Sequence, residues 1–207
     1  DKIDRKKKIR IVGDYDIDGV CSTYILYKAF LRLGAPVDYD IPDRIRDGYG
    51  INESIIEKAA EQGIDTILTC DNGISAYSQI ELAKKKGMTV VITDHHEVPL
   101  EEGKEIIPPA DAVIDPKREE CSYPFPEICG AVVAWKLVQV LFAECGVPAK
   151  EWEELLEFAA IAAVGDVMRL QDENRIIVKY GLSRMEHTSS IGLRKLAAKN
   201  NLDLSQI

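Results

Sequence analysis

The chain has 207 residues, of which 46% are hydrophobic and 29% are charged, and its formal net charge at neutral pH is −9. These proportions are ordinary for a soluble globular protein and exclude a disordered chain. No apolar run approaches the roughly 20 residues of a membrane span. The negative charge argues against a long basic surface for nucleic acid, although divalent ions bound among the acids would offset part of it.

The cysteines and the start of the chain bear on the cellular compartment. An odd number of cysteines without a C-x-x-C pair or a regular spacing predicts reduced thiols, and we expect all five to be small buried hydrophobic residues. No signal peptide opens the chain. We therefore expect a cytoplasmic protein. The five cysteines are Cys21, Cys70, Cys121, Cys129 and Cys145.

The first half of the chain alternates short apolar runs with patterns of helical length. The β-branched runs predict strands over residues 9–13, 37–41, 66–70 and 89–93. The periodic patterns, each followed by a glycine, predict helices over residues 19–33, 52–62 and 75–86, with Asn52 as an N-cap. This alternation predicts an α/β fold: a doubly wound, mainly parallel sheet of about five strands, flanked by helices.

The second half is less regular. Residues 97–126 are rich in proline and acids and contain one short predicted strand at 112–114. Such a long connection is either a lid over a site or variable surface. The remaining patterns predict a C-terminal helical segment with helices over residues 127–145, 150–164, 173–186 and 190–199.

Three acids alternate directly after the first predicted strand, at Asp14, Asp16 and Asp18. In extended backbone, residues two apart share a face, so the three carboxylates would point one way, and Gly19 would let the chain turn into the next helix. A calcium loop of the EF-hand type also alternates acids, but its twelfth position is Glu, and that position here is Ile25. Capping of the next helix explains only one of the three acids.

Polar residues also follow the third and fourth predicted strands, as Asp71-Asn72-Gly73 and Asp94-His95-His96. Each motif alone could be a turn or an exposed loop. The carboxyl ends of parallel strands lie at one edge of a sheet, where ligands bind, and buried carboxylates at close quarters repel one another unless a cation lies among them. Mixed carboxylate and imidazole donors suit Mn²⁺ or Mg²⁺ better than Zn²⁺. The combination predicts a metal site.

These motifs, in this order, resemble a known superfamily. Residues 13–20, 71–75 and 94–96 are similar to the first three motifs of the DHH phosphoesterase superfamily and, within it, of the RecJ single-stranded-DNA exonucleases. Residues 129–137 resemble the fourth motif, and residues 166–175 resemble the segment that supplies a late aspartate ligand. The similarity covers almost the whole chain.

The resemblance implies roles for individual residues. It implies two divalent ions, Mn²⁺ or Mg²⁺, coordinated by Asp16, Asp18, Asp71, His95 and Asp166. Asp71 would bridge the ions, and Asp14 and Asp94 would lie close by, as further ligands or as acceptors that orient imidazoles. His96 would face the scissile phosphate as a charge-stabilising donor or a general acid. Catalysis is thus expected to involve Asp71, Asp94 and His96.

Three residues are candidates for substrate binding. Tyr49 lies between two glycines and could stack on a base or contact a phosphate; the alternative is a tyrosine packed on its own turn. Its similarity to the RecJ pattern, together with Arg44, favours substrate binding. Arg175 could bind a phosphate or form an ion pair with Asp172 or Glu173. His187 matches no motif.

Two residues depart from the family pattern, and one domain of the family is missing. Val132 stands where the fourth motif usually has a second glycine, and Asp115 precedes Pro116 where RecJ sequences often have Asn. RecJ proteins continue into a second domain with a glycine-rich motif, and nothing in this chain resembles it. We expect a DHH catalytic domain over residues 1–187 and a helical linker toward that second domain over residues 188–207.

The resemblance implies a hydrolase: an exonuclease that degrades single-stranded DNA from the 5′ end to mononucleotides during DNA repair and recombination. Single-stranded DNA is the expected substrate, and a single-stranded-DNA-binding protein or a helicase is a candidate partner. A related enzyme acting on short oligoribonucleotides, cyclic dinucleotides or pyrophosphate is the alternative, which the acidic surface favours. A catalytically inactive scaffold is a third hypothesis, and the presence of every proposed ligand argues against it.

Overall fold

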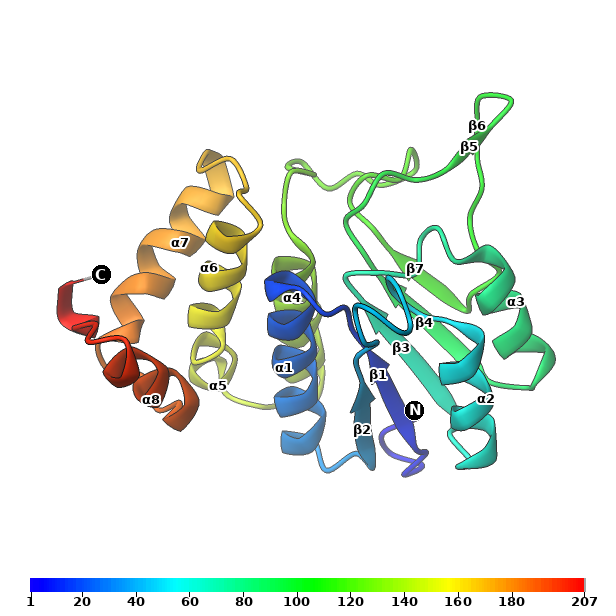
Figure 1. Ribbon diagram of the computed structural model, residues 1–207, viewed down its shortest axis with the longest axis horizontal. Coiled ribbons are helices and arrows are strands. Elements are labelled where there is room, and N and C mark those ends of the chain that lie inside the picture. The colour runs from blue at the N-terminus through cyan, green and yellow to red at the C-terminus, as the bar shows by residue number, and fades with distance from the viewer. Residues whose placement is uncertain (207) are drawn as a thin grey trace.

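The computed structural model, described here over residues 1–206, is built around a five-stranded sheet in which all neighbouring strands are parallel (Figure 1). This confirms the predicted fold class. The strands, in spatial order, are β2 (Val37–Asp40), β1 (Ile9–Val12), β3 (Thr66–Cys70), β4 (Thr89–Thr93) and β7 (Ala112–Ile114).

Helices cover both faces of this sheet. On one face lie α1 (Ile17–Arg32) and α4 (Gly130–Glu144), and on the other lie α2 (Glu53–Glu61) and α3 (Tyr77–Lys85) (Figure 1). Every residue of β1 and β3 is buried, as expected for central parallel strands covered on both faces. The hydrophobic core is accordingly divided by the sheet into two clusters.

A further layer of helices packs outside α1 and α4 (Figure 1). It contains α5 (Ala149–Glu153), α6 (Leu156–Gly165), α7 (Asp172–Met185) and α8 (Ile191–Lys199), and the 3-10 helix η1 (Leu204–Gln206) follows. Gly181 brings α7 close to α6, because a Cβ there would lie 2.3 Å from Cβ of Ala160. No helix within residues 1–206 is long and apolar enough to cross a membrane.

Most predicted elements are confirmed to within one or two residues, the usual uncertainty of element ends. Asn52 caps α2 as predicted, since its side chain accepts a hydrogen bond from the amide of Ile55. Three predictions were wrong. The helix expected from residue 127 begins at Gly130, because Cys129 is still extended.

The second wrong prediction is the single helix over residues 150–164, which is divided into α5 and α6. The carbonyl of Trp152 accepts hydrogen bonds from the amide of Leu155 and from Nε1 of Trp135. A continuous α-helix would direct that carbonyl to the amide four residues later. The third is the loop 97–126, which contains an additional antiparallel hairpin, β5 (Leu100–Glu101) and β6 (Lys104–Glu105). Its turn residues Glu102 and Gly103 both have positive φ, and Glu is not a usual residue there.

The order of the strands determines where a ligand can bind. From β1 the chain continues outward to β2 and then returns to β3 on the other side of β1. The connections that leave β1 and β3 therefore diverge at their carboxyl ends, and such switch points are the usual ligand sites of doubly wound sheets. Asp14 and Asp71 lie at this point, just after β1 and β3.

Candidate metal centre

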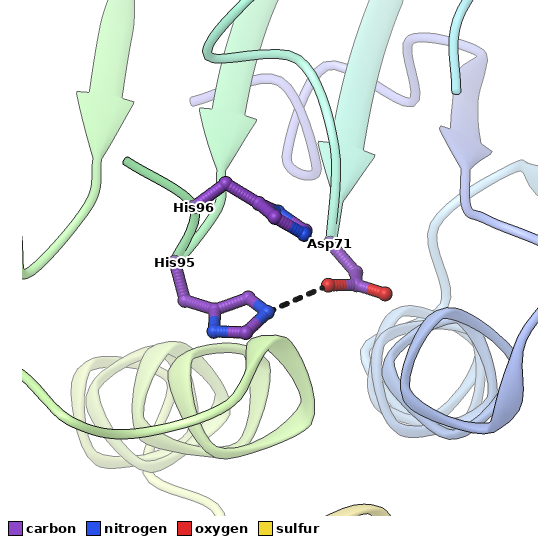
Figure 2. A group of neighbouring side chains, drawn as sticks. All are labelled: Asp71, His95 and His96. Carbon is purple, nitrogen blue, oxygen red and sulfur yellow. Dashed lines mark ion pairs between the residues drawn. The ribbon is translucent and has the colours of Figure 1, made fainter. Parts of the chain in front are cut away.

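Acidic and imidazole side chains from separate parts of the chain meet at the carboxyl edge of the sheet. Asp71 follows β3, His95 follows β4, Asp18 lies in the first turn of α1, and Asp166 directly follows α6. Nε2 of His95 lies 3.1 Å from Oδ1 of Asp71, 3.4 Å from Oδ2 of Asp18 and 4.0 Å from Oδ2 of Asp166. Figure 2 shows His95 directed at the Asp71 carboxylate. The convergence expected from the strand ends is thus present.

The potential ligand atoms form three overlapping groups, each with its atoms within 4.8 Å of one another. Asp71 and His95 each belong to two of the groups, so Asp71 has the central location that a bridging ligand requires. Six residues proposed as metal ligands from the sequence are found in these groups, whereas Asp94, named there as a possible further ligand, is not. The groups are Asp71, His95 and His96; Asp18, His95 and Asp166; and Asp14, Asp16 and Asp71.

The side chains fit a divalent cation. Among the buried atoms that have no hydrogen-bond partner within residues 1–206 are Oδ2 of Asp14, Oδ1 of Asp71 and Nδ1 of His95. In the same part of the chain, no lysine or arginine forms an ion pair with the acids of the centre. Oxygen donors with one or two imidazoles are the ligands that Mn²⁺ and Mg²⁺ accept.

The electrostatics of the centre also favour a bound cation. Burial, followed by the charge of Asp18, raises the pKa values of Asp71 and Asp166, and burial likewise raises that of Asp14. Burial lowers the pKa of His95, so its imidazole is neutral and its lone pair is available. Carboxylates with raised pKa values lose that penalty when a cation lies among them.

The three alternating acids do not share one extended face, and this prediction was wrong. Asp16 is the N-cap of α1: its side chain accepts a hydrogen bond from the amide of Gly19, 2.9 Å away. Asp18 is already helical, and Asp14 lies in the preceding loop, where it accepts from the amide of Gly50. Helical geometry starting at residue 17, rather than strand alternation, directs Asp18 toward His95.

The N-terminus of α4 binds Asp18 directly. The amides of Gly130 and Ala131 donate to its two carboxylate oxygens at 2.6 and 2.8 Å, a favourable arrangement because a helix N-terminus attracts negative charge. Each carboxylate oxygen has a second lone pair, so Asp18 can still bind an ion.

Gly130 is required for a second reason. A Cβ at this position would lie 2.8 Å from both Cβ and Oδ1 of Asp71, which is too close for any other residue. Asp71 itself has a φ of 61°, a left-handed conformation that is uncommon outside glycine and typical of functional sites. Val132, at the position of the family's second glycine, is packed in the hydrophobic core.

Asp94 contacts His96 and belongs to none of the three groups of potential ligand atoms within residues 1–206. Its Oδ1 lies 2.7 Å from Nδ1 of His96, and its oxygens also accept from the amides of Ile74 and His95. Burial alone would raise the pKa of Asp94, but these hydrogen bonds, led by that from His96, lower it. The same contact raises the pKa of His96, so its imidazole readily carries a positive charge.

Tyr49 lies beside His96, as its proposed role requires. Its hydroxyl donates to the carbonyl of Asp71 at 2.7 Å and lies 3.3 Å from both ring nitrogens of His96. Burial and the charge of Asp94 raise the pKa of Tyr49, so its hydroxyl stays protonated. The flanking Gly48 and Gly50 both have positive φ. The side chain is still half exposed and can therefore meet a ligand.

The two candidate arginines differ. The guanidinium carbon of Arg44 lies 5.3 Å from the ring centroid of Tyr15, next to the centre. Arg175 is exposed on α7 and contacts no residue of the centre within residues 1–206. Its predicted ion pair with Glu173 is also not formed, because Glu173 instead binds Lys136 and the hydroxyl of Tyr123.

Two residues that hold the site together had no role assigned from the sequence. The side-chain amide of Asn72 donates to the carbonyls of Val12 and Cys70, and its oxygen accepts from the amide of Ile51. It thereby joins the ends of β1 and β3 to the loop after β2. Asn174 similarly donates to the carbonyls of Glu127 and Arg169. Only the position of Asn72 inside its motif could have indicated this function.

Asp115 is the residue where the sequence departs from the RecJ pattern. It follows β7 and is only 3% exposed. Oδ1 accepts from the amide of Lys117 at 2.8 Å, but Oδ2 is buried without a partner within residues 1–206. Burial, with a smaller contribution from Asp94, raises the pKa of Asp115 to about 6. The additional negative charge expected near the site is therefore present.

The fold and the centre define an α/β protein with a carboxylate-rich metal site at a strand switch point. The chain belongs to the DHH family: the model of the DHH family, N-terminal domain, matches residues 8–165. This confirms the resemblance found in the sequence.

Curated relatives are similar over nearly the whole chain. The single-stranded-DNA-specific exonuclease RecJ of Bacillus subtilis is 41% identical over 204 residues, which make up 99% of this chain and 25% of that protein. The protein of the same name from Haemophilus influenzae is 36% identical over 210 residues, covering 97% of this chain and 36% of that protein. The chain thus spans about a quarter to a third of the length of these relatives.

Solved structures of RecJ proteins have a similar fold. A crystal structure of exonuclease RecJ bound to manganese has a TM-score of 0.81 and 34% identity, and the match covers 95% of this chain and 48% of that one. RecJ from Thermus thermophilus in complex with Mn²⁺ has a TM-score of 0.79 and 30% identity, covering 98% of this chain and 28% of that one.

Proposed function

We propose that this chain carries the catalytic centre of a RecJ-type exonuclease, which hydrolyses single-stranded DNA from the 5′ end to mononucleotides. The observation that carries the proposal is the cluster of buried carboxylates and imidazoles, with unpartnered ligand atoms and no paired lysine or arginine within residues 1–206. The substrate class is supported by the names of the relatives, which are single-stranded-DNA-specific exonucleases.

Two divalent ions would be held by carboxylates and one imidazole, and Asp71 would be shared by both ions. The proposed ligands are Asp14, Asp16, Asp18, Asp71, His95 and Asp166. Mn²⁺ and Mg²⁺ are both supported, since the related RecJ structures contain one or the other. Two such ions, when bound, lower the pKa of a water molecule and offset the charge of a phosphodiester.

The chain itself supplies a proton donor. Asp94 fixes the ring of His96 and raises its pKa, so His96 can hold a proton close to the leaving group. In the proposed reaction, water attacks phosphorus and gives up one proton to solvent, and the bond from phosphorus to the 3′-oxygen of the outgoing nucleotide breaks. That oxygen takes up a proton from His96, which regains one from solvent. Tyr49, with its protonated hydroxyl near His96, is proposed to contact the same nucleotide.

Hydrolysis assays test this proposal. We would incubate the chain with Mn²⁺ and single-stranded DNA labelled at either end, dinucleotides, or pyrophosphate. Asp71→Ala should abolish turnover with the fold retained by circular dichroism, whereas Asp4→Ala, at an exposed acid, should not. His96→Ala should lower turnover far more than Mn²⁺ affinity measured by calorimetry. Activity of Asp71→Ala near that of the unaltered chain would refute the assignment.

A second candidate function is hydrolysis of short oligoribonucleotides, cyclic dinucleotides or pyrophosphate. The net charge of −9 favours it, because a long polyanion is repelled more strongly than a small one. Turnover of the small substrates without cleavage of the strand would support this alternative.

The cellular setting is also a proposal. We infer a cytoplasmic enzyme of DNA repair and recombination, assisted by a single-stranded-DNA-binding protein or a helicase, in line with its RecJ-type relatives. The division into a catalytic domain over residues 1–187 and a linker over residues 188–207 remains a prediction. Limited proteolysis checks this division, because a protease should cut first near residue 188.

A further inference from the structure

The loop between β2 and α2 contains a turn that is closed by its own hydrogen bonds. Oδ1 of Asp43 accepts from the amides of Ile45 and Arg46 at 2.9 and 3.0 Å, and Oδ2 of Asp47 accepts from the amide of Asp43 at 2.9 Å. The amide of Asp47 donates to the carbonyl of Asp43. All of these bonds lie within residues 43–47, so they define the shape of the turn but not its position relative to the metal centre.

The end of the loop, residues 49–51, is hydrogen-bonded to the metal centre. The amide of Gly50 donates to Asp14, the amide of Ile51 donates to Asn72, and the hydroxyl of Tyr49 donates to the carbonyl of Asp71. Between these contacts and the turn lies Gly48, whose φ is 76° and beside which a Cβ would meet nothing within 4 Å. Gly48 thus lies between the hydrogen-bonded end of the loop and the turn.

Tyr15 provides the contact between the turn and the centre. The Arg44 guanidinium lies over its ring at 5.3 Å, and the same ring meets Tyr49 edge-on, with centroids 6.5 Å apart and planes at 88°. Tyr15 lies between Asp14 and Asp16 in the sequence, so its backbone is directly connected to these acids. Arg44 forms no ion pair within residues 1–206.

We propose that Tyr15 is a positioning residue, which holds the guanidinium of Arg44 ready to bind a phosphate of the substrate strand. An arginine that is free to move among exposed carboxylates, such as Asp16, Asp43 and Asp47, would pair with one of them. Stacking on an aromatic face keeps the guanidinium N–H donors unused, and these match a phosphate bidentately. This inference rests on the proposed function, because it requires a strand that passes the centre.

The expected loss of affinity follows from the strength of the cation–π contact between Arg44 and Tyr15. An exposed cation–π contact corresponds to a factor of about 2 to 5 in affinity. Removing the ring should therefore weaken strand binding by that factor and raise KM with little change in kcat, because chemistry at the metal centre is not altered. Tyr15→Phe retains the aromatic face and should behave as the unaltered chain.

A double-mutant cycle tests the proposal. Binding of a fluorescent single-stranded oligonucleotide would be measured by anisotropy in Ca²⁺, with electrophoresis to verify that the strand is intact, for Tyr15→Leu, Arg44→Gln and the double variant. If Tyr15 acts through Arg44, the double variant binds no more weakly than Arg44→Gln alone. Both single variants should also reduce the salt dependence of binding, with the slope falling by up to about 0.7 for one lost phosphate contact.

Tyr39→Leu is the control, since Tyr39, like Tyr15, meets another tyrosine ring edge-on, that of Tyr27 at 5.2 Å, but lies in strand β2. It should leave binding unchanged. Independent, additive losses from Tyr15→Leu and Arg44→Gln, or equal losses from Tyr15→Phe and Tyr15→Leu, would overturn the positioning role while the proposed function stands. A chain that neither binds nor cleaves single-stranded DNA would refute the proposed function and this inference with it.

Discussion

Replacement of Asp115 by asparagine should change the unfolding free energy of the metal-free protein by an amount that depends on pH and moves in favour of the variant as pH rises. Asp115 is almost completely buried, and one of its oxygens has no partner within residues 1–206. Its pKa in the folded protein is raised to about 6, from an ordinary value of 3.8. A carboxyl group whose pKa is higher in the folded than in the unfolded protein destabilises the folded protein when it is ionised. This loss of unfolding free energy grows as pH rises from the pKa of the unfolded state to that of the folded state.

The magnitude follows from the shift. A difference of about 2 pKa units corresponds to about 3 kcal/mol when the acid is fully ionised, and we expect about 2 kcal/mol of this to remain after solvent screening. About half of that cost should develop between about pH 5 and about pH 8. The asparagine amide leaves a buried N–H group without a partner, which costs about 1–3 kcal/mol, but this cost does not vary with pH.

Urea unfolding followed by tryptophan fluorescence, in EDTA, measures the effect. The difference in unfolding free energy between Asp115→Asn and the unaltered chain should move in favour of the variant by about 1 kcal/mol from about pH 5 to about pH 8. Asp4→Asn changes an exposed acid and should show no such trend. A difference that stays constant with pH would refute the conclusion that Asp115 is ionised at a cost.

Two further substitutions test the packing and the electrostatics of the centre. Gly130→Ala places a methyl group 2.8 Å from Asp71, so it should cost about 1–3 kcal/mol of stability and weaken Mn²⁺ binding in calorimetry. Gly192→Ala, where the nearest atom would lie 3.7 Å from the added Cβ, is the control and should be neutral or stabilising. Tight Mn²⁺ binding by Gly130→Ala would contradict the close packing. Asp71→Asn should abolish the increase in unfolding free energy, about 2.7 kcal/mol, that Mn²⁺ at about 100 times Kd is expected to give the unaltered chain. Equal Mn²⁺ stabilisation of both proteins would show that Asp71 is not a ligand.

The sequence was sufficient to predict the sheet and the meeting of Asp71 and His95, because parallel strands bring their carboxyl ends to one edge whatever their exact lengths. It was insufficient for Asp166. That residue reaches the centre only because α6 packs against α1 and α4, a tertiary arrangement without local signal, and its role was inferred only by resemblance to the family.

Local conformation explains the remaining errors. The alternation of Asp14, Asp16 and Asp18 is compatible with a strand and with a helix start, and the capping bond from Gly19 to Asp16 decides for the helix. The division of α5 from α6 depends on the indole of Trp135, a residue of another helix, which takes up a backbone carbonyl. No pattern within residues 150–164 contains that information.

The centre illustrates how a buried acidic cluster can exist although no lysine or arginine within residues 1–206 pairs with it. Part of the charge is met by backbone amides: those of α4 bind Asp18, and those of Ile74 and His95 bind Asp94. Within residues 1–206, Oδ1 of Asp71 accepts no hydrogen bond, because Gly130 packs against it where a donor could otherwise lie. A donor there would stabilise the metal-free protein but would occupy the lone pair needed for the ion. The missing hydrogen bond at Asp71 therefore lowers the stability of the metal-free protein and, at the same time, leaves this oxygen able to bind a metal.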